Sequence, residues 1–160
     1  ARASLELAEF LAEDQKRRVL IVDAGFGENL LSRQFQVAST PGFLNMLNGT
    51  QEQTTSLAVG TGHPQVFFLP GGETSQGVTQ LLMSERLHER IAEMKQHYDY
   101  VLLTCPSLIE DSASLAFPSV VDCVLVLVVP GTTRLSEAET CRKTLEHCKA
   151  RKVGLILASR

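Results

Sequence analysis

The stretch Arg18-Val19-Leu20-Ile21-Val22-Asp23-Ala24 decides the fold of this chain. Four consecutive apolar residues lead into an acid, and two glycines, Gly25 and Gly27, follow it. A short, unbroken apolar run of this kind is typical of a strand that is buried on both faces. In an open α/β sheet, ligands bind at the carboxyl ends of the strands. The stretch therefore predicts a strand that is buried on both faces, with Asp23 at the edge of a ligand site. The most hydrophobic strand, residues 123–129, is the predicted centre of the sheet.

The composition sets the protein class. The chain has 160 residues, of which 44% are hydrophobic and 21% charged, and its net charge is −3. This length and composition predict one globular domain covering residues 1–160. Lys and Arg form no basic stripe, which argues against a nucleic-acid-binding face. The longest apolar run, residues 123–129, is far shorter than the roughly 20 residues of a membrane-spanning helix.

The four cysteines and four histidines do not form a recognisable site. None of the cysteines forms a CxxC pair, and no Cys/His spacing matches a zinc site. We expect reduced thiols packed as small apolar groups, and histidines on solvated loop and helix faces. They are Cys105, Cys123, Cys141 and Cys148, and His63, His88, His97 and His147.

Helical and strand patterns alternate along the whole chain. Strands are predicted at 19–23, 66–69, 99–104, 123–129 and 153–158, and a short edge strand is possible near 57–59. Helices are predicted at 3–16, 30–35, 43–47, 78–97 with a break near Met83-Ser84, 111–117 and 136–151. After the break, Ser84 is expected to cap the following helix through its side chain. This alternation predicts a parallel sheet with helices on both faces. Because the chain opens in a helix, we expect an N-terminal strand and loop to be missing, and the chain to be a fragment of a longer one.

Six segments in order resemble the cytoplasmic kinase domain of the bacterial tyrosine autokinases (BY-kinases) of exopolysaccharide and capsule export. That family lies within the wider class of MinD/ParA-like P-loop ATPases. The segments are the Walker A′ strand 18–24, Pro41-Gly42-Phe43-Leu44 with 47–49, the strand 66–71, the segment 81–86, the Walker B strand 98–103, and the run 121–133. The resemblance covers nearly the whole chain and implies a P-loop NTPase-like fold.

The resemblance also implies a chemistry. In the family, a Gly-rich loop cradles the phosphates of ATP, and a Ser/Thr hydroxyl and carboxylates hold Mg²⁺. ATP or ADP with Mg²⁺ would be the cofactors if this function is retained. A C-terminal tyrosine cluster supplies the phosphoacceptors. The only tyrosines here, Tyr98 and Tyr100, lie at a strand, so the chain has no predicted phosphoacceptor.

The motif positions are degenerate. Asp23 keeps the first Walker A′ acid, but Gly25 stands at the second, and Thr104 stands at the Walker B acid. Ala1 falls at the Mg²⁺-binding Ser/Thr position, with the phosphate loop before it, and Pro106 follows in a Thr-Cys-Pro-Ser sequence where the family has Asp-Thr-Pro-Pro. Further departures are Gly27-Glu28-Asn29 in place of Arg-Arg-Pro, and Ala158 or Ser159 in place of the Asn at the adenine. The predicted nucleotide-binding positions are thus Ala1, Asp23, Gly25, Thr104 and Pro106, with Asp23 as the one vestigial catalytic and metal position.

Each of these residues also has a plain structural interpretation. Asp23 can cap the turn that follows it, and Gly25 with Gly27 can form a tight strand-to-helix turn. Glu110 and Asp111 can replace the lost Walker B acid from a neighbouring loop, or cap the next helix. Since Mg²⁺ needs one or two carboxylates beside the phosphates, the loss of two acids should remove most of the rate.

The sequence therefore predicts a non-catalytic, autokinase-like domain that acts as a regulatory or scaffold element in exopolysaccharide biosynthesis and export. The alternatives are an active ATP-dependent protein tyrosine autokinase and a MinD/ParA-like positioning ATPase. The resemblance implies polysaccharide co-polymerase or other export-machinery partners, a homo-oligomer, no nucleic acid and only indirect membrane contact. It places the chain in the cytoplasm, at the inner face of the inner membrane.

Overall fold

The computed structural model describes residues 2–13, 16–26, 30–38, 41–49, 53–73 and 77–158. The chain forms two compact units, Ala1–Cys105 and Pro106–Arg160. This division neither confirms nor contradicts the expected single domain, which stays a prediction. Among the described residues, no helix has the length and apolar character needed to cross a bilayer.

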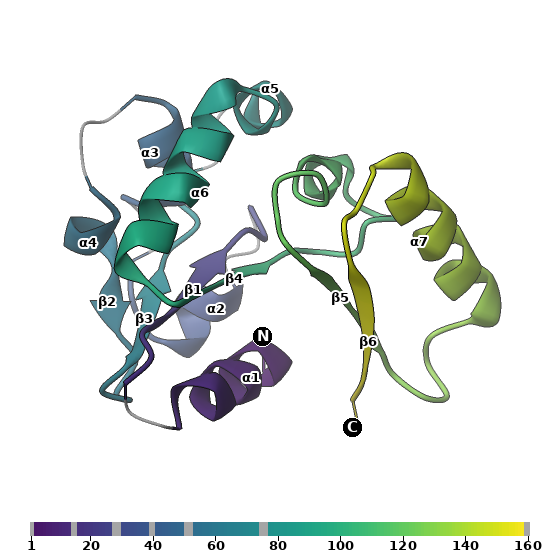
Figure 1. Ribbon diagram of the computed structural model, residues 1–160, viewed down its shortest axis with the longest axis horizontal. Helices are drawn as coiled ribbons and strands as arrows, with labels where there is room; N and C mark the ends of the chain where they lie inside the picture. The colour runs from purple at the N-terminus through teal and green to yellow at the C-terminus, as the bar shows by residue number, and fades with distance from the viewer. Residues whose placement is uncertain are drawn as a thin grey trace. The chain divides into compact units, whose positions relative to one another are not determined.

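The first unit is built on a four-stranded sheet with the order β2-β3-β1-β4 (Figure 1). The strand β1 pairs in parallel with β3 on one side and β4 on the other, whereas the short β2 is antiparallel to β3. The strands are β1 (Val19–Asp23), β2 (Val59–Gly60), β3 (Val66–Leu69) and β4 (Tyr100–Thr104). The helices are α1 (Arg2–Ala12), α2 (Leu30–Gln34), α3 (Phe43–Leu47), α4 (Thr54–Leu57), α5 (Val78–Leu82) and α6 (Glu85–His97).

The strand β1 lies at the centre of this unit and is buried, as its sequence predicts. The predicted sheet centre, residues 123–129, is wrong, because this segment contains β5 of the two-stranded sheet in the second unit. All five residues of β1 are buried. Because side chains alternate along a strand, Val19 and Ile21 lie on one face and Leu20 on the other. The Val19 face packs against Ala8 and Ala12 of α1 in the hydrophobic core. Figure 1 shows α6 on the other side of the sheet, so both faces of β1 are covered by helices.

The second unit is a two-stranded parallel sheet with one long helix. The strands β5 (Val124–Val128) and β6 (Val153–Leu157) pair in register, and α7 (Leu135–His147) connects them (Figure 1). A 3₁₀ helix, η1 (Ser112–Ala116), precedes β5. Asp111 caps this helix through its Oδ1, which accepts the Ala113 N–H at 2.9 Å. The helix-capping interpretation of Asp111 is therefore confirmed.

The structure departs from the predicted elements mainly where segments are short. The region 53–60 contains α4 and β2, of which the sequence indicated only the strand. The helix predicted over 78–97 breaks as expected, and Ser84 is the N-cap of α6. However, the Ser84 hydroxyl makes no capping bond; it donates to the Leu81 carbonyl at 2.6 Å and thereby closes α5. The cap position is correct, and the expected capping bond is wrong.

Candidate functional site

The candidate site lies at the carboxyl ends of β1 and β4. Asp23 and Thr104 are direct register partners in these parallel strands. The Ala24 N–H continues the pairing by donating to the Thr104 carbonyl at 2.9 Å. Register partners in a parallel pair point to the same face, and here it is the face that α1 covers. The structure thus brings together two of the positions that the sequence singled out.

Asp23 is held inside the protein rather than presented to solvent. Its side chain is only 3% exposed, and its Oδ1 accepts the Gly25 N–H at 3.1 Å. This bond is the turn-capping contact that the sequence offered as the structural interpretation of Asp23 and Gly25. The other oxygen, Oδ2, is buried and has no hydrogen-bond partner among the described residues.

Burial raises the pKa of Asp23 above its ordinary value of 3.8 because it penalises the charged form. Backbone N–H groups of Gly25, Ser32 and Leu31 lower the pKa in part. Only the Gly25 group has ordinary hydrogen-bond geometry, so the other two act as nearby dipoles. The carboxyl group is therefore poorly prepared to carry a charge by itself.

The Thr104 hydroxyl makes a hydrogen bond to a residue that the sequence did not suggest. Its Oγ1 donates to the Ser4 Oγ at 3.0 Å, which ties the first turn of α1 to the end of β4. The two residues are 100 positions apart, so no local pattern could have paired them. Next to Thr104, the Cys105 thiol contacts the Leu103 carbonyl at 3.8 Å.

Ser32 is a second residue that sequence reasoning missed. It lies in α2, it is 2% exposed, and its hydroxyl has no hydrogen-bond partner among the described residues. Its backbone N–H acts on the Asp23 carboxyl, so the two residues are neighbours. In the sequence it looks like an ordinary polar position of a short amphipathic helix.

A glycine-lined contact flanks the site at the end of β3. The Phe43 N–H donates to the Pro70 carbonyl at 2.8 Å, and the Leu44 N–H donates to the Gly71 carbonyl at 2.9 Å. A Cβ atom on Gly42 would lie 2.3 Å from the Pro70 oxygen. The two backbones can approach this closely only because residue 42 has no side chain. The segment that begins at Pro41 thus docks directly on the loop after β3.

The remaining predicted positions lie either outside the described residues or in the second unit. Ala1, Gly27, Glu28, Asn29 and Ser159 lie outside the described residues. Pro106 opens the second unit, where its carbonyl accepts the Ser114 hydroxyl at 3.4 Å. Glu110 is exposed in the same unit. At the end of β6, the Ala158 N–H donates to the Val128 carbonyl at 3.0 Å.

Both tyrosines are engaged at the opposite end of the sheet. Tyr98 is 4% exposed, and the Arg18 guanidinium lies 4.9 Å from the centre of its ring and 4.9 Å from that of Phe67. Burial raises the pKa of Tyr98, and the Arg18 charge lowers it in part. The Tyr100 hydroxyl accepts a hydrogen bond from Arg17. Tyr98 is thus buried, whereas Tyr100 is half-buried and bonded to Arg17.

The donor set at the strand ends does not fit Mg²⁺. Among the described residues, it comprises the buried Asp23 carboxyl group, the buried Ser32 hydroxyl, and the hydroxyls of Thr104 and Ser4, which are bonded to each other. Mg²⁺ prefers octahedral oxygen ligands that include one or two carboxylates besides phosphate oxygens. In the described part of the chain, no group of three or more His, Cys, Asp or Glu side chains could hold a metal ion.

Comparison with known proteins relates the chain to bacterial kinases. No protein-family model matches the sequence. The tyrosine-protein kinase ptk of Acinetobacter johnsonii is 26% identical over 154 residues, which are 96% of the chain and 21% of the kinase. The tyrosine-protein kinase CpsD of Streptococcus agalactiae is 24% identical over 143 residues, which are 88% of the chain and 61% of CpsD. The chain thus spans about a fifth of one relative and less than two thirds of the other.

Solved structures agree with this relationship. The kinase domain of VpsO superposes with a TM-score of 0.87 at 25% identity, covering 98% of the chain and 76% of that domain. The kinase domain of the Escherichia coli tyrosine kinase ETK gives 0.86 at 22% identity, covering 96% and 59%. The MinC:MinD cell division complex of Aquifex aeolicus gives 0.71 at 22% identity, covering 94% and 59%. The chain is therefore a relative of the bacterial tyrosine-protein kinases and has their P-loop NTPase-like fold, as its sequence motifs predicted.

Proposed function

We propose that the chain is a non-catalytic, autokinase-like domain that acts as a regulatory or scaffold element in exopolysaccharide biosynthesis and export. The observation that carries the proposal is the strand-end cluster of Asp23, Gly25 and Thr104, which contains a single carboxylate. The metal and positioning effects of phosphoryl transfer each supply several kcal/mol of barrier reduction. A cluster with one buried carboxylate supports little of that chemistry.

The biological setting comes from the relatives. Tyrosine-protein kinases are the proteins that this chain resembles over 96% of its own length. By this sequence similarity, the proposed partners are a polysaccharide co-polymerase or other export-machinery proteins, or further copies of the chain. The domain then works in the cytoplasm, at the inner face of the inner membrane, and contacts the membrane only through those partners.

A direct test is phosphoryl transfer by the purified chain. With Mg²⁺ and radiolabelled ATP, we expect neither hydrolysis nor autophosphorylation above the rate of the Asp23→Ala variant. A clear rate that Asp23→Ala abolishes would overturn the proposal. Calorimetric titration with ADP and ATP is expected to show weak binding or none, and no effect of Mg²⁺.

The scaffold role is tested in the source bacterium. Deletion of the gene is expected to change the yield of exported polysaccharide, and complementation with Asp23→Asn should restore it as fully as the unaltered gene does. If only the unaltered gene restores export, the carboxylate has a chemical role and the domain is not a passive scaffold.

The active tyrosine autokinase remains the second candidate because the similar proteins are named as kinases. It requires Glu28, Glu110 or Asp111 to serve in place of the lost acids. Asp111 is engaged as the cap of η1, and Glu28 lies outside the described residues. The third candidate, a MinD/ParA-like positioning ATPase, rests on the shared fold and on a distant sequence similarity to a protein named as MinD. Binding of the chain to DNA or to bare liposomes would favour this third candidate.

A further inference from the structure

The strand β6 has one edge that faces no other described strand. It pairs only with β5, in the two-stranded parallel sheet of the second unit (Figure 1). A two-stranded sheet is marginally stable by itself and gains from a further strand. Edge strands that stay unpaired are normally protected by charged residues, by proline or by a bulge. The β6 sequence Val-Gly-Leu-Ile-Leu contains neither a charge nor a proline, so this edge is open to another strand.

The hydrogen bonds between β5 and β6 show which backbone groups of β6 face outward. The Lys152 carbonyl accepts the Val124 N–H at 2.9 Å. At the other end of the strand, the Ala158 N–H donates to the Val128 carbonyl at 3.0 Å. Successive residues of a strand direct their N–H and C=O groups to alternate edges. The even-numbered residues of β6 therefore face β5, and the odd-numbered residues direct their backbone groups to the free edge.

The same odd-numbered residues carry the most exposed side chains of this sheet. Val153, Leu155 and Leu157 are 51%, 71% and 73% exposed, whereas Leu125 and Leu127 of β5 are 45% and 46% exposed. A strand that pairs with this edge would satisfy backbone groups and remove apolar surface from water at the same time. The free edge of β6, rather than that of β5, is therefore the favoured contact surface.

We infer that β6 binds a second copy of this chain, with the two β6 strands antiparallel about a two-fold axis at Leu155. A two-fold contact requires a self-complementary surface, and this register provides one. Val153 lies opposite Leu157 of the second copy, and Gly154 leaves space opposite Ile156 of the second copy. The inference goes beyond the proposed function, because it names a surface and does not depend on the loss of catalysis.

The charges beside β6 are compatible with this register. Lys152 precedes the strand and lies opposite Ala158 of the second copy, so six residues, roughly 20 Å of strand, separate the two Lys152 positions. This separation exceeds the screening length of about 8 Å in physiological salt, so the like charges repel each other little. One pair of short strands buries less than the roughly 800 Å² per partner of a standard stable interface, so we expect a reversible, concentration-dependent dimer.

The register predicts which engineered cysteine forms a disulfide between two copies. Leu155 lies opposite its own equivalent, with the Cα atoms about 5.5 Å apart, a distance that a disulfide can span. Leu157 is as exposed as Leu155, but it lies roughly 14 Å from its own equivalent, four residues along the strand.

The cross-linking test uses the full chain with Cys123→Ser, which removes the exposed native thiol. Copper–phenanthroline in air is the oxidant, and non-reducing gel electrophoresis measures the dimer. Leu155→Cys is expected to give about tenfold more disulfide-linked dimer than the matched control Leu157→Cys, because Cα atoms more than about 7 Å apart are not bridged without backbone movement.

Sedimentation velocity measures the association without a cross-link. The sedimentation coefficient of the unaltered chain is expected to rise with protein concentration. Leu155→Lys places two like charges directly opposite each other and should sediment as a monomer at every concentration. Leu127→Lys makes the same change at an exposed position of β5 and should leave the association unchanged. Circular dichroism shows whether both variants fold.

Three outcomes would overturn the inference. Equal cross-linking of Leu155→Cys and Leu157→Cys would indicate random collision rather than a fixed register. An unaltered chain that is monomeric at every concentration would show that the β6 edge stays unpaired. Loss of association in Leu127→Lys but not in Leu155→Lys would place the contact on β5. The cysteine variants add no charge, so they decide the question even if Leu155→Lys fails to fold. None of these results bears on phosphoryl transfer, so the proposed function stands or fails separately.

Discussion

Asp23 shows how burial changes the meaning of a motif residue. The sequence placed it at a metal position, whereas in the structure its carboxyl group is 3% exposed and bonded to the turn after β1. Because its pKa is raised in the folded state, the protonated form stabilises the fold. That contribution is complete below the ordinary pKa of 3.8 and is lost as the pH rises through the folded-state pKa.

Replacing Asp23 by a neutral isostere should therefore stabilise the protein at high pH. We expect Asp23→Asn to raise the free energy of unfolding by about 1 kcal/mol at pH 8, since it removes a buried charge with an unpartnered oxygen. The gain should shrink as the pH falls towards 4. Urea denaturation across pH 4 to 8 measures both effects. Asp23→Ala is the control, because it also removes the acceptor of the Gly25 N–H and should destabilise. A loss of stability in Asp23→Asn at every pH would mean that a charge at this position is favoured.

Gly42 gives a second prediction that depends on a single atom. A Cβ there would lie 2.3 Å from the Pro70 oxygen and 2.4 Å from the Gly72 nitrogen, both of which are backbone atoms that cannot rotate away. We expect Gly42→Ala to destabilise by about 3 kcal/mol, at the upper end of overpacking costs. The control is Gly60→Ala, because a Cβ on Gly60 meets nothing within 4 Å. Thermal unfolding of the two variants should differ clearly, and equal melting temperatures would show that the loop after β3 can move.

At the scale of elements, the strong periodic patterns were readable and the short polar ones were not. Apolar spacing predicts the helices α1 and α6, because each buries one apolar stripe. It also predicts the strand β1, because this strand is buried on both faces. The helix α4 has four residues, Thr54–Leu57, of which only Thr54 is buried. This helix packs on α6 through the contacts of Thr54 with Glu93, and no local sequence pattern indicates such a tertiary contact.

Glu93 of α6 makes that docking contact and gives the third prediction. Its Oε1 accepts the Thr54 N–H at 3.1 Å and the Thr54 hydroxyl at 3.2 Å, while Arg90 donates to Oε2 at 2.7 Å. Burial alone would raise the pKa of Glu93, but the Arg90 and Thr54 contacts lower it overall. A lowered folded-state pKa gives stability that is present above the ordinary value of 4.5 and is lost as the pH falls through the folded-state pKa.

We therefore expect Glu93→Gln to cost about 1–2 kcal/mol of unfolding free energy at pH 7, because hydrogen bonds to a charged group are stronger than those to an amide. The difference from the unaltered chain should disappear below pH 4. Glu89→Gln, at an exposed position of the same helix, is the matched control and should change stability little. Urea denaturation at pH 7 and pH 4 measures both variants. A loss of unfolding free energy in Glu93→Gln that persists at pH 4 would mean that the shape of the Glu93 side chain, rather than its charge, holds α4 against α6.

At the scale of the molecule, the sequence predicted the fold and the strand-end location of the site, but not the site's contacts. Motif order identified the architecture because each strand ends in a recognisable turn. The bond between Ser4 and Thr104 joins residues 100 positions apart, and the unpartnered Ser32 hydroxyl depends on how α2 meets the end of β1. Such tertiary contacts have no local signature. For the same reason, the sequence offered two meanings for Asp23 and could not choose between them.

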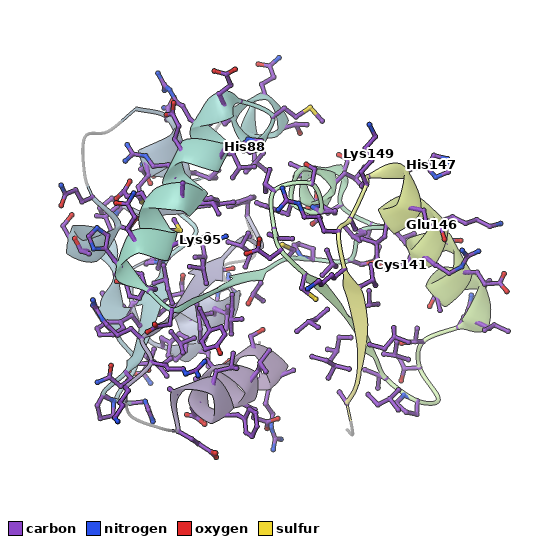
Figure 2. The ribbon with its side chains drawn as sticks, viewed as in Figure 1. His88, Lys95, Cys141, Glu146, His147 and Lys149 are labelled. Carbon is purple, nitrogen blue, oxygen red and sulfur yellow. The ribbon has the colours of Figure 1, made fainter. Side chains whose placement is uncertain are left out.

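The thiols give a prediction that spans both units. All four cysteines lie in the described range 77–158, and none forms a disulfide. Cys123, just before β5, is exposed, which differs from the packed thiol expected from the sequence; the other three are half-buried. Burial raises the pKa of Cys141 on α7 (Figure 2), so less of it is the reactive thiolate near neutral pH.

We therefore expect an aromatic disulfide reagent at pH 8 to modify one thiol fast and Cys141 slowly. The Cys123→Ser variant should lose the fast phase, while 6 M guanidinium should reveal four thiols in the unaltered chain and three in the variant. A fast phase that persists in Cys123→Ser would place the accessible thiol elsewhere and contradict the exposure of the segment before β5.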